Sequence, residues 1–298
     1  MVNPPKISIV TASYNQGQFI EETIQSVLHQ NYPNLEYIII DGGSTDNTVE
    51  IIKKYEKHLK FWVSEKDSGQ AHAINKGLQY CTGEIFNWLN SDDYLEAGAL
   101  EKIVNAFGDD EVQMVAGKVR NFSSTQEEIV PNQNLTAEGL MCWQADVKFV
   151  QPGVWLRRSG IEDCGGIDEQ FHYAFDWDLY IRYLYHFSEV KEVDDLLVHF
   201  RLHGNSKTQS LTERFGEEER KIIEKLRKIP EFHGLHKACD YKIQKTNWTA
   251  FLSELSENSE PFVKNFFTVL SRMTEYDKVS FSRQTLGALN AFLRKKVI

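Results

Sequence analysis

The first ninety residues alternate between two hydrophobic periods. Short runs rich in β-branched residues, such as KISIVTA at 6–12, are typical of buried strands, whereas the segments between them space apolar side chains as on one face of a helix. Asn31-Tyr32-Pro33 indicates the end of the first helical segment. The pattern predicts strands at 6–12, 35–40, 61–65 and 85–89, with helices at 17–30, 69–80 and, after the second strand, a third ending near residue 57.

This β-α-β-α-β-α-β order favours a mostly parallel, Rossmann-like α/β sheet with helices on both faces. Such sheets bind ligands beyond the carboxyl ends of their strands. A single polar cluster at a strand end is more often an ordinary loop, but four at one edge of a sheet predict a binding cleft. The four clusters are Thr11-Ala12-Ser13-Tyr14-Asn15, Asp41-Gly42-Gly43, Glu65-Lys66-Asp67 and Asn90-Ser91-Asp92-Asp93.

The rest of the chain is less regular. Residues 117–166 show no clear period, 176–187 predicts a helix, and 189–202 predicts one or two strands followed by a loop at 203–206. From about residue 212 onward the pattern is mostly helical with mixed charge. We therefore predict an α/β domain at 1–206 and a helical C-terminal region at 207–298.

Composition narrows the functional classes. Apolar residues at 41% and charged residues at 26% are ordinary for a globular protein, and the formal charge of −10 argues against a nucleic-acid partner. The four cysteines form no C-x-x-C pair, which favours reduced thiols over a zinc site or disulfides. Apolar runs stay well short of the ~20 residues that a membrane-spanning helix needs, so the sequence predicts a cytoplasmic protein.

The loop after the first strand indicates which kind of nucleotide the cleft would accept. A dinucleotide site predicts G-x-G-x-x-G and a P-loop ends in Gly-Lys-Ser/Thr, whereas the segment TASYNQGQF has a single glycine and neither pattern. Its hydroxyls, its amide and the ring of Tyr14 are suited to stacking on a nucleobase and bonding to it.

Two adjacent carboxylates, Asp92 and Asp93, follow the fourth predicted strand. Their mutual repulsion is costly unless a cation lies nearby, and Mg²⁺ and Mn²⁺ prefer oxygen ligands that they share with substrate phosphates. Such an ion would assist the departure of a diphosphate as a Lewis acid. The competing interpretation is that one carboxylate caps a helix that begins near Ala97.

Five segments occur in order along the chain: SIVTASYNQGQFIEETIQSVLHQ, YIIIDGGSTDNT, SEKDSGQAHAINKGL, GEIFNWLNSDDYLEAGAL and AFDWDLYIRY. Together they resemble the family 2 inverting glycosyltransferases of GT-A fold, over about residues 6–206. The resemblance implies an enzyme that uses a nucleotide-diphosphate sugar, often a uridine one, with Mn²⁺ or Mg²⁺. It makes 1–206 the nucleotide-sugar-binding and catalytic domain.

The resemblance also implies which residues bind the donor. The first turn corresponds to the family's base-binding loop, and Asp41 corresponds to the carboxylate that contacts the base. Ile74 stands where many relatives have arginine, so a diphosphate contact from that position is missing. The residues assigned to the nucleotide sugar are Thr11, Ser13, Tyr14, Asn15, Asp41, Lys66, Asp67, Asn75, Ser91 and Asp93.

Asn90-Ser91-Asp92 occupies the family's Asp-x-Asp position, with a neutral Asn90 in place of the first carboxylate. The resemblance therefore makes Asp92 the main metal ligand and Asp93 a helper at the sugar or the metal. The stretch HFRLHGNSKT resembles the family's late histidine-containing loop, which makes His203 a second candidate ligand for the metal or the diphosphate. A lone histidine is more often structural.

Inverting transfer needs a base that takes the proton of the acceptor hydroxyl, and one carboxylate suffices. The segment AFDWDLYIRY assigns this role to Asp176, with Phe175 where relatives often have glutamate. Asp178 is the competing candidate, although its spacing to Arg182 favours an i,i+4 ion pair. In VQPGVWLRRS, Gln151 and Trp155 are the predicted acceptor contacts, with core or loop positions as the alternative.

The C-terminal segment 281–298 has four basic and no acidic residues, and it places Leu286, Leu289, Leu293 and Val297 near helical spacing. Such a helix could lie on an anionic membrane. Packing on the protein's own core is equally compatible with the pattern and is favoured, because apolar stripes of this kind usually face a core. Together with the resemblance, the sequence predicts sugar transfer to a saccharide or lipid-linked saccharide in cell-surface polysaccharide synthesis, in the cytoplasm or at the inner face of the membrane. The alternatives are a sugar-phosphate nucleotidyltransferase and a non-catalytic nucleotide- or glycan-binding module.

Overall fold

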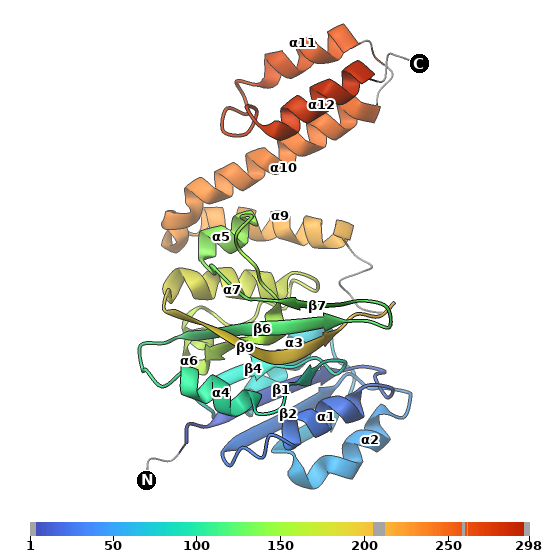
Figure 1. Ribbon diagram of the computed structural model, residues 1–298, viewed down its shortest axis with the longest axis vertical. Helices are drawn as coiled ribbons and strands as arrows, with labels where there is room; N and C mark the ends of the chain where they lie inside the picture. The colour runs from blue at the N-terminus through green and yellow to red at the C-terminus, as the bar shows by residue number, and fades with distance from the viewer. Residues whose placement is uncertain (1–3, 205–211, 258–259, 261, 295–298) are drawn as a thin grey trace. The chain divides into compact units, whose positions relative to one another are not determined.

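The computed structural model describes residues 4–204, 212–257, 260 and 262–294 (Figure 1). The chain forms two compact units, Met1–Glu218 and Glu219–Ile298. The sequence boundary near residue 206 lies outside the described residues. Within the described ranges, no helix has both the length and the apolar character needed to cross a membrane.

The first half of the larger unit confirms the predicted alternation. Strands β1 (Ile7–Ser13), β2 (Leu35–Asp41), β3 (Phe61–Ser64) and β4 (Ile85–Trp88) lie in the order β3-β2-β1-β4, and all three pairings are parallel. Helices α1 (Ile20–Leu28), α2 (Thr48–Tyr55) and α3 (Gln70–Leu78) connect them, with a short 3₁₀ turn after α2. Nearly every residue of β1, β2 and β4 is buried, as expected for strands that are covered on both faces.

The second half of this unit makes the sheet mixed. Its nine strands follow the order β3-β2-β1-β4-β8-β6-β9-β5, with β7 added to β6. Strand β8 is antiparallel to both β4 and β6, whereas β9 is parallel to β6. The elements are β5 (Tyr94–Leu95), α4 (Ala99–Ala106), β6 (Met114–Phe122), β7 (Glu127–Val130), α5 (Ala137–Cys142), β8 (Val154–Arg157), α6 (Arg158–Asp163), α7 (Phe175–His186) and β9 (Val190–Arg201).

Three strands lie wholly or partly in the stretch 117–166, for which the sequence shows no clear hydrophobic period. The residues of β7 are EEIV and mostly exposed, and those of β8 are VWLR, a buried run with no alternation. Neither has a period that identifies a strand. Both form because they pair with β6, which is a tertiary interaction that local periodicity does not report.

The hydrophobic core of the larger unit lies between the sheet and its helices. Gly77 shows how closely α3 packs on β1, because a Cβ at that position would lie 2.5 Å from Cγ1 of Val10. Both strands and helices contribute residues to this core. Among its buried members are Ile7, Ile9, Ile20, Ile24, Tyr37, Ile39, Ile52, Leu100, Ile103 and Trp155.

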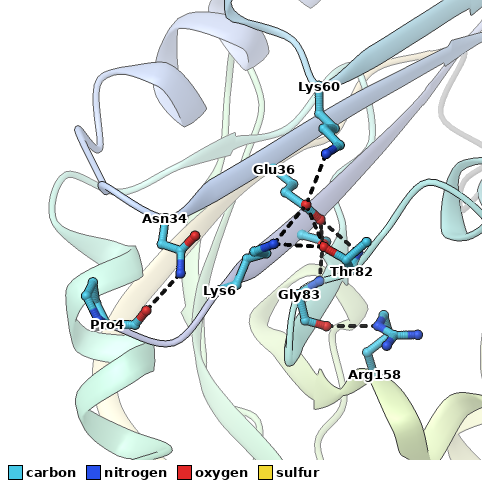
Figure 2. A network of polar contacts seen from close by, with 9 residues as sticks. Pro4, Lys6, Asn34, Glu36, Lys60, Thr82, Gly83 and Arg158 are labelled. Atoms are coloured by element: carbon cyan, nitrogen blue, oxygen red, sulfur yellow. Dashed lines mark hydrogen bonds and ion pairs between the residues drawn. The ribbon is translucent and has the colours of Figure 1, made fainter. Parts of the chain in front are cut away.

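A buried carboxylate ties together the amino ends of the parallel strands, at the opposite edge from the predicted cleft (Figure 2). Glu36 of β2 accepts hydrogen bonds from Ser8 Oγ (2.8 Å), Thr82 N (2.7 Å) and Thr82 Oγ1 (2.7 Å). Lys6 and Lys60 lie 3.4 and 3.6 Å from the same carboxylate. Burial raises the pKa of Glu36, but the bonds from Thr82 and Ser8 and the charge of Lys6 outweigh it and lower the pKa to about 2.

The smaller unit is helical. Its own hydrophobic cluster includes Trp248, Leu252 and Val269, with Leu289 packed against it, whereas Leu286 is 68% exposed. The side chain of Leu293 and all of Val297 lie outside the described residues. Helix α9 (Thr212–Lys228) begins in the larger unit, and η3 (Pro230–Leu235), α10 (His236–Glu257), α11 (Phe262–Arg272) and α12 (Arg283–Arg294) follow.

Candidate active site

The loops after β1 and β2 are bonded to each other. Asn15, in the left-handed region at φ 51°, accepts a hydrogen bond from Thr45 N at 2.8 Å, and its own N–H donates to Ser44 Oγ at 2.7 Å. The Asp41 carboxylate accepts from Ser44 N (2.9 Å) and Ser64 Oγ (2.6 Å). Asp41 therefore organises the loop that follows it, and together these contacts form one wall of the predicted cleft.

The side chains of the predicted base-binding turn differ in exposure, and Tyr14 and Asn15 are the exposed ones. Tyr14 is 60% exposed, whereas Thr11 and Ser13 are buried. Thr11 Oγ1 lies 3.1 Å from the hydroxyl of Tyr37. Ser13 Oγ has no hydrogen-bond partner within the described part of the chain. Tyr14 is thus the side chain here whose ring is free to stack on a planar base.

The residues near α3 that were predicted to bind the nucleotide sugar contact different parts of the chain. Asp67 lies against the β2 loop, because a Cβ on Gly42 would be 2.8 Å from Asp67 Oδ2. Lys66 is exposed. Asn75 instead donates to the carbonyl of Ile167 at 2.9 Å and so holds the segment that precedes α7. The structure thus places Asp67 against the loop after β2, whereas Asn75 binds the segment before α7.

The adjacent carboxylates after β4 point in different directions. Asp92 Oδ2 lies 2.9 Å from Nε2 of His203, and both side chains are partly exposed, at 19% and 16%. Asp93 is 1% exposed and accepts from the backbone N–H of Arg201 at 2.9 Å. Burial and the neighbouring Asp92 raise the pKa of Asp93. Asp92 therefore faces the surface with His203, while Asp93 attaches β9 to the end of β4.

Asn90 is part of the same network. Its Nδ2 donates to Asp93 Oδ2 at 3.0 Å, and its Oδ1 accepts from Gln70 Nε2 at 2.7 Å. An aspartate could not make the first of these bonds, because a carboxylate has no N–H to donate. Ser91 between them is buried. The neutral residue at this position thus satisfies a buried carboxylate next to the candidate metal ligand.

Arg201, the last residue of β9, was not identified from the sequence. Its guanidinium lies 4.8 Å from the ring centre of Phe19 and 4.7 Å from that of Phe122, and its Nε donates to the carbonyl of Asp92 at 3.0 Å. It also pairs with Glu22. The available signal was its spacing, two residues before His203, which places both side chains on one side of an extended chain.

Asp92 and His203 suit a divalent cation that also binds phosphate. Among the described residues there is no cluster of three or more His, Cys, Asp or Glu side chains that could enclose a metal. Mg²⁺ and Mn²⁺ at substrate phosphates commonly take one or two protein ligands and complete their shells with phosphate and water. An imidazole nitrogen beside a carboxylate oxygen fits Mn²⁺ better than Mg²⁺.

The candidate base lies in the first turn of α7. Asp176 is partly exposed and its Oδ1 accepts from Trp177 N at 2.7 Å. Asp178 is fully buried and receives two bonds from Arg182, at 2.9 and 2.6 Å, which confirms the predicted ion pair. Of the two carboxylates, only that of Asp176 is near solvent.

The segment before α7 lies against the start of α3. A Cβ on Gly69 would be 3.4 Å from Nδ1 of His172, four residues before Asp176. The next residue, Gln70, is the one that bonds Asn90. Helix α3 therefore links the segment of Asp176 to the end of β4.

The two predicted acceptor contacts are both internal. Gln151 is 8% exposed and donates to Asn87 Oδ1 and Trp88 O, each at 3.1 Å. Trp155 on β8 is 1% exposed and packs in the main core. This agrees with the alternative that assigned them to the core, and we do not include them in the proposed site.

Comparison with known proteins identifies the family of the chain. The sequence model of glycosyl transferase family 2 matches residues 8–165. The chain is 42% identical over 101 residues to TuaG of Bacillus subtilis (strain 168), provisionally a teichuronic acid biosynthesis glycosyltransferase, covering 33% of this chain and 40% of TuaG. It is 30% identical over 159 residues to the glycosyltransferase GlyG of Streptococcus pneumoniae, covering 51% of this chain and 52% of GlyG. The matches thus span about half or less of these relatives.

Solved structures share the fold at lower identity. TarS 1–349 of S. aureus, in complex with UDP-GlcNAc, superposes with a TM-score of 0.66 at 18% identity, over 80% of this chain and 72% of that one. The mannosyltransferase PcManGT of Pyrobaculum calidifontis, in complex with GDP-Man and Mn²⁺, gives 0.60 at 19% identity, over 98% and 87%. Because the family match covers more than half of the chain and the folds agree, this protein belongs to glycosyl transferase family 2 and has the GT-A fold.

Proposed function

We propose that the protein transfers a sugar from a nucleoside-diphosphate sugar, most simply a uridine one, to a hydroxyl of a saccharide or lipid-linked saccharide, with inversion at the anomeric carbon. Family membership supports glycosyl transfer in general. The observation that carries the specific proposal is the pairing of Asp92 with His203 at the end of β4, together with a separate, partly exposed carboxylate, Asp176, at the start of α7.

The donor would lie across the ends of the parallel strands. Tyr14 stacks on the base, and the bonded loops of Asn15 and Asp41 shape the wall around it. Asp92 and His203 are the residues that would hold Mn²⁺ or Mg²⁺. When bound, that ion supplies positive charge that stabilises the departing diphosphate. Solved relatives carry UDP-GlcNAc in one case and GDP-Man with Mn²⁺ in another, which supports a donor of this class.

Asp176 acts as the base. The acceptor hydroxyl gives its proton to the carboxylate while its oxygen forms a bond to the anomeric carbon. The bond between that carbon and the diphosphate oxygen breaks, and the diphosphate leaves with the electron pair. Attack from the face opposite the leaving group inverts the configuration.

The acceptor would belong to a cell-surface polysaccharide, presented at the inner face of a membrane. The provisional assignment of TuaG to teichuronic acid biosynthesis supports this class. Exposed apolar side chains in the C-terminal unit support contact with a lipid surface: Phe281 is 84% exposed, and Phe267 on α11 is 62% exposed.

The proposal is tested by incubating the protein with a panel of sugar nucleotides, acceptor saccharides and Mn²⁺ while measuring nucleoside diphosphate release. We expect Asp176→Asn to lose at least about a hundredfold in kcat, which is the usual size of a general-base contribution, with unchanged affinity for UDP. Pyrophosphate release from a nucleoside triphosphate would instead support a nucleotidyltransferase. Binding without turnover, for every donor and acceptor pair, would support a non-catalytic module.

A further inference from the structure

A buried carboxylate on α9 binds the chain immediately before the candidate base. Glu218 is 8% exposed and accepts three backbone hydrogen bonds, from His172 at 2.9 Å, Tyr173 at 2.8 Å and Ala174 at 2.9 Å. These are the last three residues before α7, and Asp176 is the second residue of that helix. A single side chain, 42 residues further along the chain, therefore fixes the path of the backbone that leads to Asp176.

Helix α7 has no capping side chain of its own that could fix its first turn. A helix leaves its first N–H groups without intrahelical partners, and a side chain at the N-cap commonly accepts from one of them. The N-cap residue here is Ala174, and α7 has no side-chain cap bond of its own. The Glu218 carboxylate accepts the hydrogen bond from the N–H of Ala174, and its negative charge lies at the positive end of the helix dipole.

Neighbouring residues on α9 hold the same segment. Arg214, one turn before Glu218, donates to the hydroxyl of Tyr173 at 2.8 Å. The ring of Phe215 lies 6.3 Å from that of Trp177, the residue after Asp176. Helix α9 thus contacts the chain on both sides of the candidate base.

We propose that Glu218 is a positioning residue for sugar transfer, which sets the location of the Asp176 carboxylate by binding the 172–174 backbone. The proposal rests on Asp176 being the base. Glu218, like Asp176 itself, lies beyond residues 8–165, which the family model matches.

The first test is Glu218→Gln in the full chain. An amide offers one acceptor oxygen in place of two and no charge, so the segment before α7 should lose part of its restraint. We expect kcat to fall about 10- to 100-fold, since a displacement near 1 Å has such effects, while the Kd for UDP changes less than about twofold. Glu217→Gln is the matched control, because Glu217 is its exposed neighbour on the same helix.

A double variant separates positioning from a general structural effect. If Glu218 acts through Asp176, Glu218→Gln should cause no further loss of rate in an Asp176→Asn background. Independent, multiplying losses would overturn the proposal, as would an unchanged kcat or an equal loss of kcat and UDP affinity in the single variant. If Asp176→Asn keeps full activity, the assignment of Asp176 as the base is wrong. If Asp176→Asn is inactive but Glu218→Gln has normal activity, only the positioning role of Glu218 is wrong.

Should Glu218→Gln not fold, Glu218→Asp provides the second variant. It keeps the charge but shortens the side chain by one methylene, so we expect near-native thermal unfolding and a kcat between those of the wild type and Asp176→Asn. Amide hydrogen exchange reports the restraint directly: exchange at 172–174 should accelerate at least about tenfold in the variant. Unchanged exchange and unchanged kcat in a folded Glu218→Asp protein would overturn the proposal.

Discussion

The adjacent carboxylates after β4 lie in different environments. Asp92 meets His203 near the surface, whereas Asp93 is buried and receives bonds from Asn90 and the Arg201 backbone. The guanidinium of Arg201 lies between aromatic rings and donates to the Asp92 carbonyl. The segment that carries Asp92 is thus held in place by hydrogen bonds from Asn90 and Arg201.

This arrangement predicts that an aspartate in place of Asn90 would destabilise the protein. Asn90→Asp removes the N–H that bonds Asp93 and adds a carboxylate beside two others. We expect a loss of about 1–3 kcal/mol in the free energy of unfolding at neutral pH without metal, since a buried acceptor loses its donor. Urea unfolding measures it. Asn105→Asp, at an exposed position on α4, is the control and should change stability little; an equal effect of both substitutions would contradict this explanation.

At the scale of elements, the parallel half of the sheet was predictable and the other half was not. Strands β1 to β4 are short, mostly apolar runs separated by segments with helical spacing, so local sequence identifies them. Strands β7 and β8 depend on pairing with β6. The residues of the candidate site also fall into a group that local sequence indicates and a group that it does not. Short motifs indicated the candidate ligands Asp92 and His203, whereas Glu218 and Arg201 contact segments that are distant in the sequence, and no motif records such contacts.

The network of Glu36 predicts how stability depends on pH. Its folded pKa of about 2 lies below the value near 4.3 expected in the unfolded chain, so ionised Glu36 stabilises the protein by about 3 kcal/mol above that value. This contribution is lost as pH falls from about 4 through about 2. Glu36→Gln should therefore reduce the free energy of unfolding at pH 7, and its difference from the wild type should shrink on acidification.

Urea unfolding between neutral pH and pH 3 measures this difference. Glu127→Gln on β7 is the control, because Glu127 is 60% exposed and pairs with Arg120 only at the surface. Its effect should be small at every pH, as for most exposed ion pairs. A Glu36→Gln difference that is the same at all pH values would show that packing, and not the ionised network, carries the effect.

At the scale of the whole molecule, charge is distributed unevenly along the sequence. The chain has a formal charge of −10, yet residues 262–298 contain seven lysine and arginine residues and only two acidic ones. The same region exposes an apolar face on α11, formed by Val263, Phe267 and Leu270, and also exposes Phe281. Basic charge together with exposed apolar side chains is typical of segments that bind anionic lipid surfaces.

We therefore expect the full protein to bind vesicles of phosphatidylcholine mixed with phosphatidylglycerol more tightly than vesicles of phosphatidylcholine alone, and less tightly at high salt, because salt screens the attraction. The double substitution Phe267→Ser with Phe281→Ser should weaken binding at least about tenfold, since each phenyl ring loses part of its burial in lipid. Co-sedimentation measures the bound fraction. Ile129→Ser, at a 48% exposed position on β7, is the matched control and should bind as the wild type does. Equal binding to both kinds of vesicle, or equal binding of the double variant and the wild type, would contradict binding of this apolar face and its basic residues to an anionic lipid surface.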